Sequence, residues 1–354
     1  MRIAIVNDSP VAQEVLKQII FCKPGYKIAW TAWNGQEAVK RCVQDRPDLI
    51  LMDLLMPVMD GVEATRRIMA QSPCPILIVT ASVYGRSVTV FEALGAGAMD
   101  AIRTPVISGG CEGHEVQALL KKIETIGLLT TDKVHSIGDL KESVVPCRYQ
   151  ETMGFRPIVA IGASTGGPDA ILRVLSVLPF DFPAPLVVVQ HMEPRFLQGF
   201  VSWLNEQIEL PVKVALEGME PFPGKVFVAH TNMHLVLNGR LRFAYQECNQ
   251  AGPFCPSVDL FFLSLARNWP WKGVAFLLTG MGRDGAQGLL ELQKKGWCTA
   301  AQDKDSCAVY GMPKAAVELG AAKKILSTGE MGQLLLRYFS KRDKGREDSD
   351  ILAL

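Results

Sequence analysis

The chain has 354 residues, of which 48% are hydrophobic and 21% are charged, and its formal net charge is +1. This length accommodates two ordinary domains, and the composition is that of a globular protein. The balanced charge, together with the lack of a basic helix-turn-helix stretch in the second half, disfavours nucleic acid as a partner. We expect a cytoplasmic location without membrane insertion, because no window approaches about 18 uninterrupted apolar residues and the N-terminal apolar run is too short for a signal peptide.

Nine cysteines are scattered along the chain without C-x-x-C pairs. In a chain without a secretory signal, this pattern predicts reduced thiols. We therefore expect neither a disulfide framework nor a zinc site.

The first 120 residues alternate strand-like and helix-like segments. The apolar runs at 2–7, 48–53 and 75–81 have the length of buried strands, and turn residues and amphipathic stretches follow them. This alternation is typical of βα units around a parallel sheet. It predicts a first α/β domain over residues 1–120, with its last strand at 100–104.

The alternation stops over residues 121–154, which are polar and lack a sustained period, and we interpret them as a linker. It returns over 155–340, where we expect a second α/β domain with a doubly wound, mostly parallel sheet. Residues 341–354 begin with a run of mixed charges and are interpreted as a charged tail. Strands of the second domain are expected at 157–164, 185–191, 225–230 and 273–280, and helices at 167–179 and 284–296.

Polar side chains follow the strands of the first domain. The first strand ends at Asn7 and Asp8, the run at 48–53 ends at Asp53, and the next strand ends at Thr80. Sites in open parallel sheets form at the carboxyl ends of the strands, and oxygen ligands of this kind suit Mg²⁺. They predict a metal-assisted phosphoryl site with Asp53 as nucleophile. The structural alternative is that Asp8 caps a helix with Ser9 and that Asp53 only begins a turn.

The first half resembles a response-regulator receiver domain, with its flavodoxin-like parallel five-stranded sheet. The resemblance covers residues 1–120 and is carried by the strings IVNDS, LILMDLLMPVMDGVEATRRI, ILIVTAS and GAGAMDAIRTP. It implies Asp53 as the phosphoacceptor, charged by a histidine kinase of the CheA type. It also implies Asp8, Asp53 and the carbonyl of Leu55 as Mg²⁺ ligands, and Thr80 as the switch hydroxyl.

Two positions depart from the receiver pattern. Asn7 stands where receivers usually carry a second acidic residue, and Thr104 occupies the switch position where they usually carry a lysine. A lysine there would supply a cation to the phosphoryl oxygens. Arg103 is a poor substitute, because neighbouring side chains on a strand point to opposite faces. We expect weaker Mg²⁺ binding and weaker phosphoryl-driven switching.

Ser164 lies where an apolar strand of the second half breaks into a turn, within Gly162-x-Ser164-x-Gly166. Three readings are open at this stage. Ser164 or Thr165 could be the N-cap of the following helix. The glycine-rich turn could cradle a phosphate, although no Gly-Lys-Ser/Thr follows it. G-x-S-x-G between strand and helix is also the pattern of a nucleophile elbow.

A nucleophilic serine needs a general base and an orienting carboxylate. His191 and His230 each end an apolar strand at the edge where Ser164 is expected, and we favour His191. Asp284 follows another strand and is the expected orienter, although an acidic residue in the first turn of a helix also has a purely structural use. The chain order Ser, His, Asp differs from that of the α/β-hydrolases, so we do not expect their fold.

A dinucleotide site is an alternative use of the same stretch. Gly280-x-Gly282-x-x-Gly285 matches the dinucleotide fingerprint, and Asp303 follows at about the expected 20 residues. Against it, Asp284 would place a negative charge in the turn meant for the pyrophosphate.

The second half is similar to the catalytic domain of the CheB chemotaxis methylesterases. The similarity is carried by the strings IGASTGGPDAI, VVVQHM, CPSVDLFFLSLA, FLLTGMGRDGAQGL and AAQDKDSCAVYGMPKAAVE. It implies Ser164 as nucleophile, His191 as base, Asp284 as orienter, Thr165 as support for the histidine, and oxyanion stabilisation by the backbone N–H of Met281.

Details of both halves separate this chain from the common CheB pattern. Cys255 stands where the family often has arginine, and His230 stands where proline is usual. Both changes lie near the expected substrate face, so they bear on receptor preference. Asn7 and Thr104 resemble most the subgroup that serves Wsp-type surface-sensing systems.

The resemblances imply a receiver-regulated serine hydrolase that removes methyl esters from glutamyl residues on the cytoplasmic helices of methyl-accepting chemoreceptors. Related enzymes also deamidate receptor glutamines. The ester chemistry needs no cofactor, whereas receiver phosphorylation needs Mg²⁺. Two other readings remain: a phosphorylation-controlled docking module with little catalysis, and a serine esterase for small acyl esters.

Overall fold

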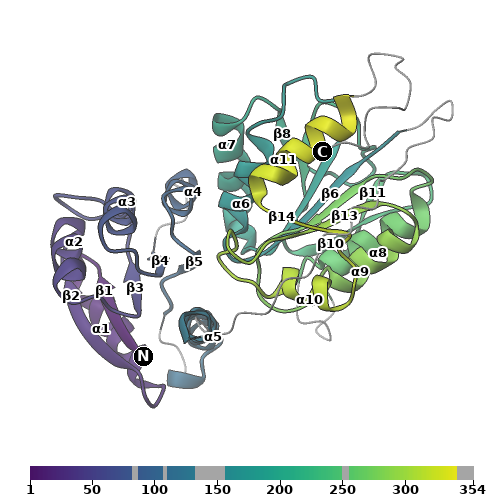
Figure 1. The fold of residues 1–354 in the computed structure, drawn as a ribbon. Coiled ribbons are helices and arrows are strands. Elements are labelled where there is room, and N and C mark those ends of the chain that lie inside the picture. The colour runs from purple at the N-terminus through teal and green to yellow at the C-terminus, as the bar shows by residue number, and fades with distance from the viewer. Residues whose placement is uncertain (82–86, 107–109, 132–155, 249–254, 341–354) are drawn as a thin grey trace.

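The computed structural model consists of two α/β units, one from each half of the chain (Figure 1). The predicted charged tail and most of the predicted linker lie outside the residues that the structure describes. The described residues are 1–354 without 82–86, 107–109, 132–155, 249–254 and 341–354.

The N-terminal unit is a parallel five-stranded sheet covered by helices on both faces. Its strands are β1 (Arg2–Val6), β2 (Lys27–Ala32), β3 (Leu49–Met52), β4 (Ile76–Thr80) and β5 (Asp100–Arg103). Its helices are α1 (Pro10–Phe21), α2 (Gly35–Gln44), α3 (Gly61–Gln71), α4 (Ser87–Gly95), the short η1 (Gly110–Glu112) and α5 (His114–Thr131). The strand order β2-β1-β3-β4-β5 reverses direction between β1 and β3, which places a site at the ends of those two strands.

The first unit extends beyond residue 120, where the sequence patterns placed its end. Helix α5 continues to Thr131, and its Ile123 and Ile126 are buried in the same core cluster as Ile3 and Leu49. The added turns therefore belong to the core of the N-terminal unit rather than to a linker. Their apolar face is interrupted by lysines and a glutamate, which hid its helical period.

The C-terminal unit is a seven-stranded parallel sheet. Its strands are β6 (Val159–Ala163), β7 (Leu186–Gln190), β8 (Val212–Val214), β9 (Val226–Val228), β12 (Val274–Leu277), β13 (Cys298–Gln302) and β14 (Lys324–Leu326). The order β14-β13-β12-β6-β7-β9-β8 shows that the chain starts at the centre, builds one side, and returns to build the other. The switch lies between β6 and β12, where a ligand crevice is expected in such a sheet.

Helices cover both faces of this sheet, and a β-hairpin not expected from the sequence packs beside it. The hairpin strands are β10 (Met233–Leu237) and β11 (Phe243–Glu247). The helices are α6 (Gly167–Leu175), η2 (Pro194–Phe196), α7 (Leu197–Gln207), α8 (Val258–Asn268), α9 (Ala286–Lys294), α10 (Met312–Glu318) and α11 (Thr328–Ser340). Within the described ranges, none of the helices is both long and apolar enough to cross a bilayer.

The two units pack together through α4 and α7. Phe91 of α4 is 1% exposed, and its ring centroid lies 5.2 Å from that of Phe200 and 5.8 Å from that of Trp203, both on α7. A third aromatic ring, that of Phe196, meets Phe91 edge-on. An apolar contact of this kind holds the N-terminal unit against the second unit.

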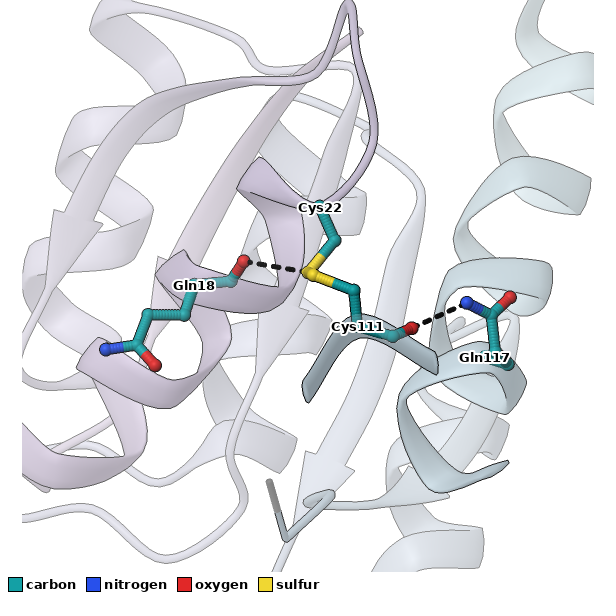
Figure 2. Close-up of a disulfide and its surroundings, with 4 residues drawn as sticks. All are labelled: Gln18, Cys22, Cys111 and Gln117. Carbon is teal, nitrogen blue, oxygen red and sulfur yellow. Dashed lines mark hydrogen bonds between the residues drawn. A yellow bond between two sulfur atoms is a disulfide. The ribbon is translucent and has the colours of Figure 1, made fainter. Parts of the chain in front are cut away.

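The expectation that all cysteines are free thiols is wrong for this structure, which contains two disulfides. Cys22 at the end of α1 is bonded to Cys111 of η1, with their Cα atoms 5.7 Å apart (Figure 2). Cys248 is bonded to Cys255, with Cα atoms 5.9 Å apart. The Cys22 pair is 89 residues apart in sequence, so only the fold brings its members together.

Candidate active site and phosphoacceptor site

Ser164 follows β6 directly, but it does not cap the helix behind it. The N-cap of α6 is Gly166, and no side chain accepts a capping hydrogen bond there. The N–H groups of the turn are also occupied, because Gly166 donates to the carbonyl of Met99 and Gly167 to that of Ser164 itself. The cap reading is therefore wrong, and the turn has little to offer a phosphate.

The backbone after β12 approaches Ser164 very closely. Ser164 N–H donates to the carbonyl of Thr279 at 3.0 Å, and a Cβ added to Gly280 would lie 2.7 Å from that of Ser164. A side chain at residue 280 would therefore displace the serine. Met281 follows this contact immediately, so its backbone belongs to the same turn, and its role in oxyanion stabilisation stays a prediction.

His191 lies at the end of the strand next to Ser164. Its N–H donates to the carbonyl of Ala163 at 3.0 Å, and Gln190 pairs with Ala163 in the parallel β6–β7 register. The buried amide of Gln190 donates to both the Ser164 carbonyl, at 2.7 Å, and the His191 carbonyl, at 2.9 Å. Residues 164 and 191 are thus held at one rim of the sheet by a side chain that sequence reasoning had not singled out.

Asp284 comes to the same rim from the turn after β12. Its Oδ2 lies 2.8 Å from Nε2 of His191, and the two side chains are 5% and 11% exposed. Burial alone would raise the pKa of Asp284, but the hydrogen bond and charge of His191 and two backbone N–H groups outweigh it and lower the pKa. An ionised Asp284 is what fixing and stabilising an imidazolium requires.

Asp284 also accepts hydrogen bonds from the N-terminus of α8. Ser257 is the N-cap of this helix, and its hydroxyl donates to Asp284 Oδ1 at 2.9 Å. Val258 N–H and Asp259 N–H donate to the two carboxylate oxygens at 2.7 and 3.0 Å. The positive end of the α8 dipole therefore adds to the stabilisation of the carboxylate. A serine just before an apolar helical run was the sequence signal for this N-cap.

His230, the alternative base, lies elsewhere. It lies two residues after β9 and packs against Tyr245, with ring centroids 6.2 Å apart, and its backbone N–H donates to the Tyr245 hydroxyl. Asp284 is paired with His191 instead, so the geometry favours His191 as the base.

The glycines of the dinucleotide-like stretch serve packing. A Cβ on Gly280 would meet Ser164 and the sulfur of Met312, and one on Gly285 would meet Leu277 and Val258. Protein atoms thus fill the space that a pyrophosphate would need, and the dinucleotide reading loses its support.

A small cavity at this rim is shared by the two units. Ser164, Gln190 and His191 line it together with Met99, Asp100 and other receiver residues, and its volume is about 30 Å³. That is room for about two water molecules and excludes a glutamyl side chain.

Thr165 takes part in the contact with the receiver. Its hydroxyl donates to Asp100 Oδ2 at 3.1 Å, and the same carboxylate oxygen pairs with Lys122 of α5 at 2.5 Å. The expected support of His191 by Thr165 stays a prediction.

The receiver site gathers around Asp53 at the end of β3. Asn7 donates to Asp53 Oδ2 at 3.0 Å, Leu54 N–H donates to Oδ1 at 2.7 Å, and the Thr80 hydroxyl is a further hydrogen-bond partner. Burial, with a smaller contribution from the negative charge of Asp8, raises the pKa of Asp53 to about 6. A cation beside Asp53 would offset this cost of ionisation.

The remaining receiver positions lie around the same edge. Asp8 is exposed, and Leu55 follows Leu54, whose backbone N–H donates to Asp53. The Thr104 N–H donates to the Thr80 carbonyl at 3.0 Å. The Thr104 hydroxyl is buried and has no hydrogen-bond partner among the described residues. Two carboxylates and a backbone carbonyl are hard oxygen donors, so the residues present fit Mg²⁺.

Comparison with known proteins identifies the family of each half of the chain. A family model described as "CheB methylesterase" matches residues 159–335, and one described as "Response regulator receiver domain" matches residues 3–108. A protein-glutamate methylesterase/protein-glutamine glutaminase 1 of Bordetella avium is 45% identical over 96% of this chain and 98% of its own length. The chain belongs to the CheB methylesterase family.

Further relatives of this CheB-family chain span its full length or its second half. A protein-glutamate methylesterase/protein-glutamine glutaminase 3 of Pseudomonas aeruginosa is 46% identical over 96% of this chain and 100% of its own. The crystal structure of the Thermotoga maritima CheB methylesterase catalytic domain is 36% identical, with a TM-score of 0.50, and covers 52% of this chain and 99% of its own. The methylesterase fold thus corresponds to the seven-stranded unit.

Proposed function

We propose that this CheB-family chain hydrolyses γ-glutamyl methyl esters on the cytoplasmic helices of chemoreceptors. The observation that supports it best is the convergence of Ser164 and His191 on one cavity, with Asp284 paired to the histidine. Three residues from different strands at one sheet edge form the constellation that acyl transfer needs. The test is release of methanol from methyl-labelled receptor by the purified full chain.

In the proposed mechanism, Ser164 Oγ attacks the ester carbonyl while Nδ1 of His191 takes its proton. Nε2–H of His191 donates to Asp284, which holds the ring and stabilises the imidazolium that forms. The Met281 N–H would stabilise the oxyanion. His191 then protonates the leaving methoxide, methanol departs, and a water activated by the same histidine cleaves the acyl-enzyme to glutamate.

The same acyl chemistry serves a glutamine substrate, with ammonia as leaving group. Either reaction leaves a carboxylate on the receptor helix. The new negative charge changes repulsion between neighbouring helices and so resets signalling.

The receiver is proposed to act as a lid over Ser164. The hydrogen bonds Gly166–Met99 and Thr165–Asp100 and the Phe91 contact hold it there. Because the closed cavity has no room for a glutamyl ester, the substrate requires an open arrangement. Phosphorylation of Asp53 by a CheA-type histidine kinase would favour that arrangement, and a few kcal/mol of coupling suffices.

Substituting Phe91 by alanine should raise the basal rate of methanol release about tenfold without phosphodonor, because the closed form loses its central apolar contact. Initial rates on methylated receptor measure this. Phe21→Ala is the matched control, since Phe21 is an exposed phenylalanine on α1, 65% accessible and away from the contact. Equal basal rates for Phe91→Ala and the unmodified chain, with both folded, would count against the lid.

Mg²⁺ at the receiver would be held by Asp8, Asp53 and the Leu55 carbonyl, and it would neutralise charge on the incoming phosphoryl group. The Asp53 carboxylate is the nucleophile, and the Asn7 amide orients its second oxygen. The Thr80 hydroxyl, a hydrogen-bond partner of Asp53, would follow the phosphoryl group, whereas Thr104 cannot supply the cation that a lysine would.

Mg²⁺ affinity of the receiver should fall as the pH drops through about 6. The raised pKa of Asp53 means that this carboxylate is ionised at pH 7 and mostly protonated at pH 5, and a proton competes with the metal. We expect roughly a tenfold loss of affinity per pH unit below about 6 in calorimetric titrations. Asp53→Asn should bind weakly at both pH values. An affinity that is constant between pH 7 and pH 5 would refute the assignment.

A further inference from the structure

The second disulfide lies close to the proposed active site. Cys248 follows β11, and Cys255 comes two residues before Ser257, the N-cap of α8. Both cysteines are only half-buried, so a small oxidant can reach them. A ring nitrogen of the buried His234 and the two sulfur atoms all lie within 4.8 Å of one another.

A short chain of hydrogen bonds connects this pair with the proposed base. The Ser257 N–H donates to Nδ1 of His234 at 3.1 Å, and the Ser257 hydroxyl donates to Asp284 at 2.9 Å. Asp284 in turn holds His191. The disulfide therefore anchors the backbone immediately before the residues that supply three of the donors to Asp284.

We propose that Cys248 and Cys255 form an oxidative modification site that controls how firmly Asp284 is held, with the disulfide form the more active one. Its kinetic consequence rests on the proposed methylesterase function. In the oxidised chain, residue 255 is tied to the end of β11, and Ser257 keeps its bonds to His234 and Asp284. Reduction removes the tether, so these donors spend less time on the carboxylate.

A hydroperoxide such as hydrogen peroxide is the oxidant that this chemistry requires. One thiolate attacks the O–O bond, becomes a sulfenic acid, and releases hydroxide, which takes a proton to leave as water. The second sulfur attacks the sulfenic sulfur, the S–O bond breaks, the S–S bond forms, and the second water leaves. The two sulfurs together lose two electrons, which the peroxide gains.

Metal binding by the same three residues is less favoured. A metal-bound imidazole normally donates from its other ring nitrogen. Nδ1 of His234 accepts a hydrogen bond from Ser257 instead, which places the proton on Nε2. Coordination through either nitrogen would therefore break the bond that positions Ser257.

Four of the other cysteines, all in the N-terminal unit, provide internal controls. Cys22 and Cys111 form a disulfide of similar Cα separation, but it lies in the receiver, between α1 and η1 (Figure 2). Cys42 and Cys74 are buried thiols of the receiver core. Oxidation at these positions should leave Asp284 untouched.

The test compares the full chain after treatment with dithiol reductant and after stoichiometric hydrogen peroxide, with the Cys248–Cys255 link confirmed by peptide mass spectrometry. Reduction should lower kcat for methanol release about threefold to tenfold, the effect of loosening one hydrogen bond, with KM little changed. Cys22→Ser/Cys111→Ser should respond like the unmodified chain. Cys248→Ser/Cys255→Ser should not respond and should resemble the reduced protein.

Amide hydrogen exchange at Val258 and Asp259 gives a readout that does not need activity. Exchange should be slower in the oxidised chain, because these N–H groups stay on Asp284. If neither the oxidised nor the reduced chain releases methanol, the methylesterase proposal fails. Amide hydrogen exchange alone then tests whether the disulfide controls how firmly Asp284 is held. Equal exchange and equal rates in both states overturn it. So does a tightly bound Zn²⁺ in the reduced chain that is lost in Cys248→Ser/Cys255→Ser, since that result assigns the pair to a metal.

Discussion

Replacing Ser164 by alanine should abolish methanol release from methylated receptor, with a loss of kcat of about 10⁴- to 10⁶-fold. The reason is that alanine removes the only atom that can form the acyl-enzyme, while the fold around it is unchanged. The hydroxyl has no capping role, because the N-cap of α6 is Gly166. Stability should therefore change little, and a thermal melt of the variant should coincide with that of the unmodified chain.

Ser176→Ala is the matched control, because this serine ends the same helix and its hydroxyl donates to the Arg173 carbonyl. Its rate should be that of the unmodified chain. Receptor binding by the unmodified chain, measured together with methanol release, distinguishes the alternatives. If the unmodified chain docks on receptor and releases no methanol, the docking-module reading is correct. If Ser164→Ala still releases methanol, the nucleophile is another residue.

Asp284→Asn should lower kcat about 10³- to 10⁴-fold. An amide at residue 284 presents a donor to His191 and so favours the wrong imidazole tautomer. It also removes the negative charge that stabilises the imidazolium. The Asp284 carboxylate accepts hydrogen bonds from Ser257, Val258 and Asp259. The Asn side chain would lose the charge that strengthens them, so we expect the free energy of unfolding to fall by about 1–3 kcal/mol.

Asp303→Asn separates the loss of kcat from the loss of stability. Asp303 follows a neighbouring strand, β13, and its carboxylate accepts from Ser306 within a turn, away from His191. That variant should lose some stability and keep its rate. Initial rates measured well below the melting temperature of each variant make the comparison. A rate for Asp284→Asn within tenfold of the unmodified chain would remove Asp284 from the mechanism.

Asp259 and Asp284 both lie at the N-terminus of α8, but their pKa values shift in opposite directions. Burial raises the pKa of Asp259 to about 6, and the charge of Asp284 adds to this shift. Asp284 accepts hydrogen bonds from His191 and from the first N–H groups of α8, and its pKa is lowered. The charge is thereby kept on the residue that faces the histidine.

Local patterns predicted the two parallel sheets and the edges at which the sites lie. Apolar runs of strand length, each followed by a turn, were sufficient for this, because parallel strands are buried on both faces. They missed the β10–β11 hairpin, whose strands are only partly buried. They also ended the first domain before α5 ended, because Ile123 and Ile126 are identified as core only by what they pack against.

The residue types at the site could be predicted, but their pairing could not. His191 and His230 both end strands, and only the packing of His230 on Tyr245 and of His191 on Asp284 separates them. The N-cap reading of Ser164 was equally reasonable from sequence. It is excluded by the position of Gly166, whose φ of 75° starts the helix in a left-handed turn.

The sequence by itself determined the two α/β halves, the strand ends at which the chemistry lies, and the family. These follow from periodicity and from motifs that are contiguous along the chain. Only the tertiary structure decided that Asp100 meets Thr165, that Ser257 supports Asp284, and that Cys248 and Cys255 pair. Such contacts join residues from separate elements, and local patterns carry no information about which surfaces the packed core brings together.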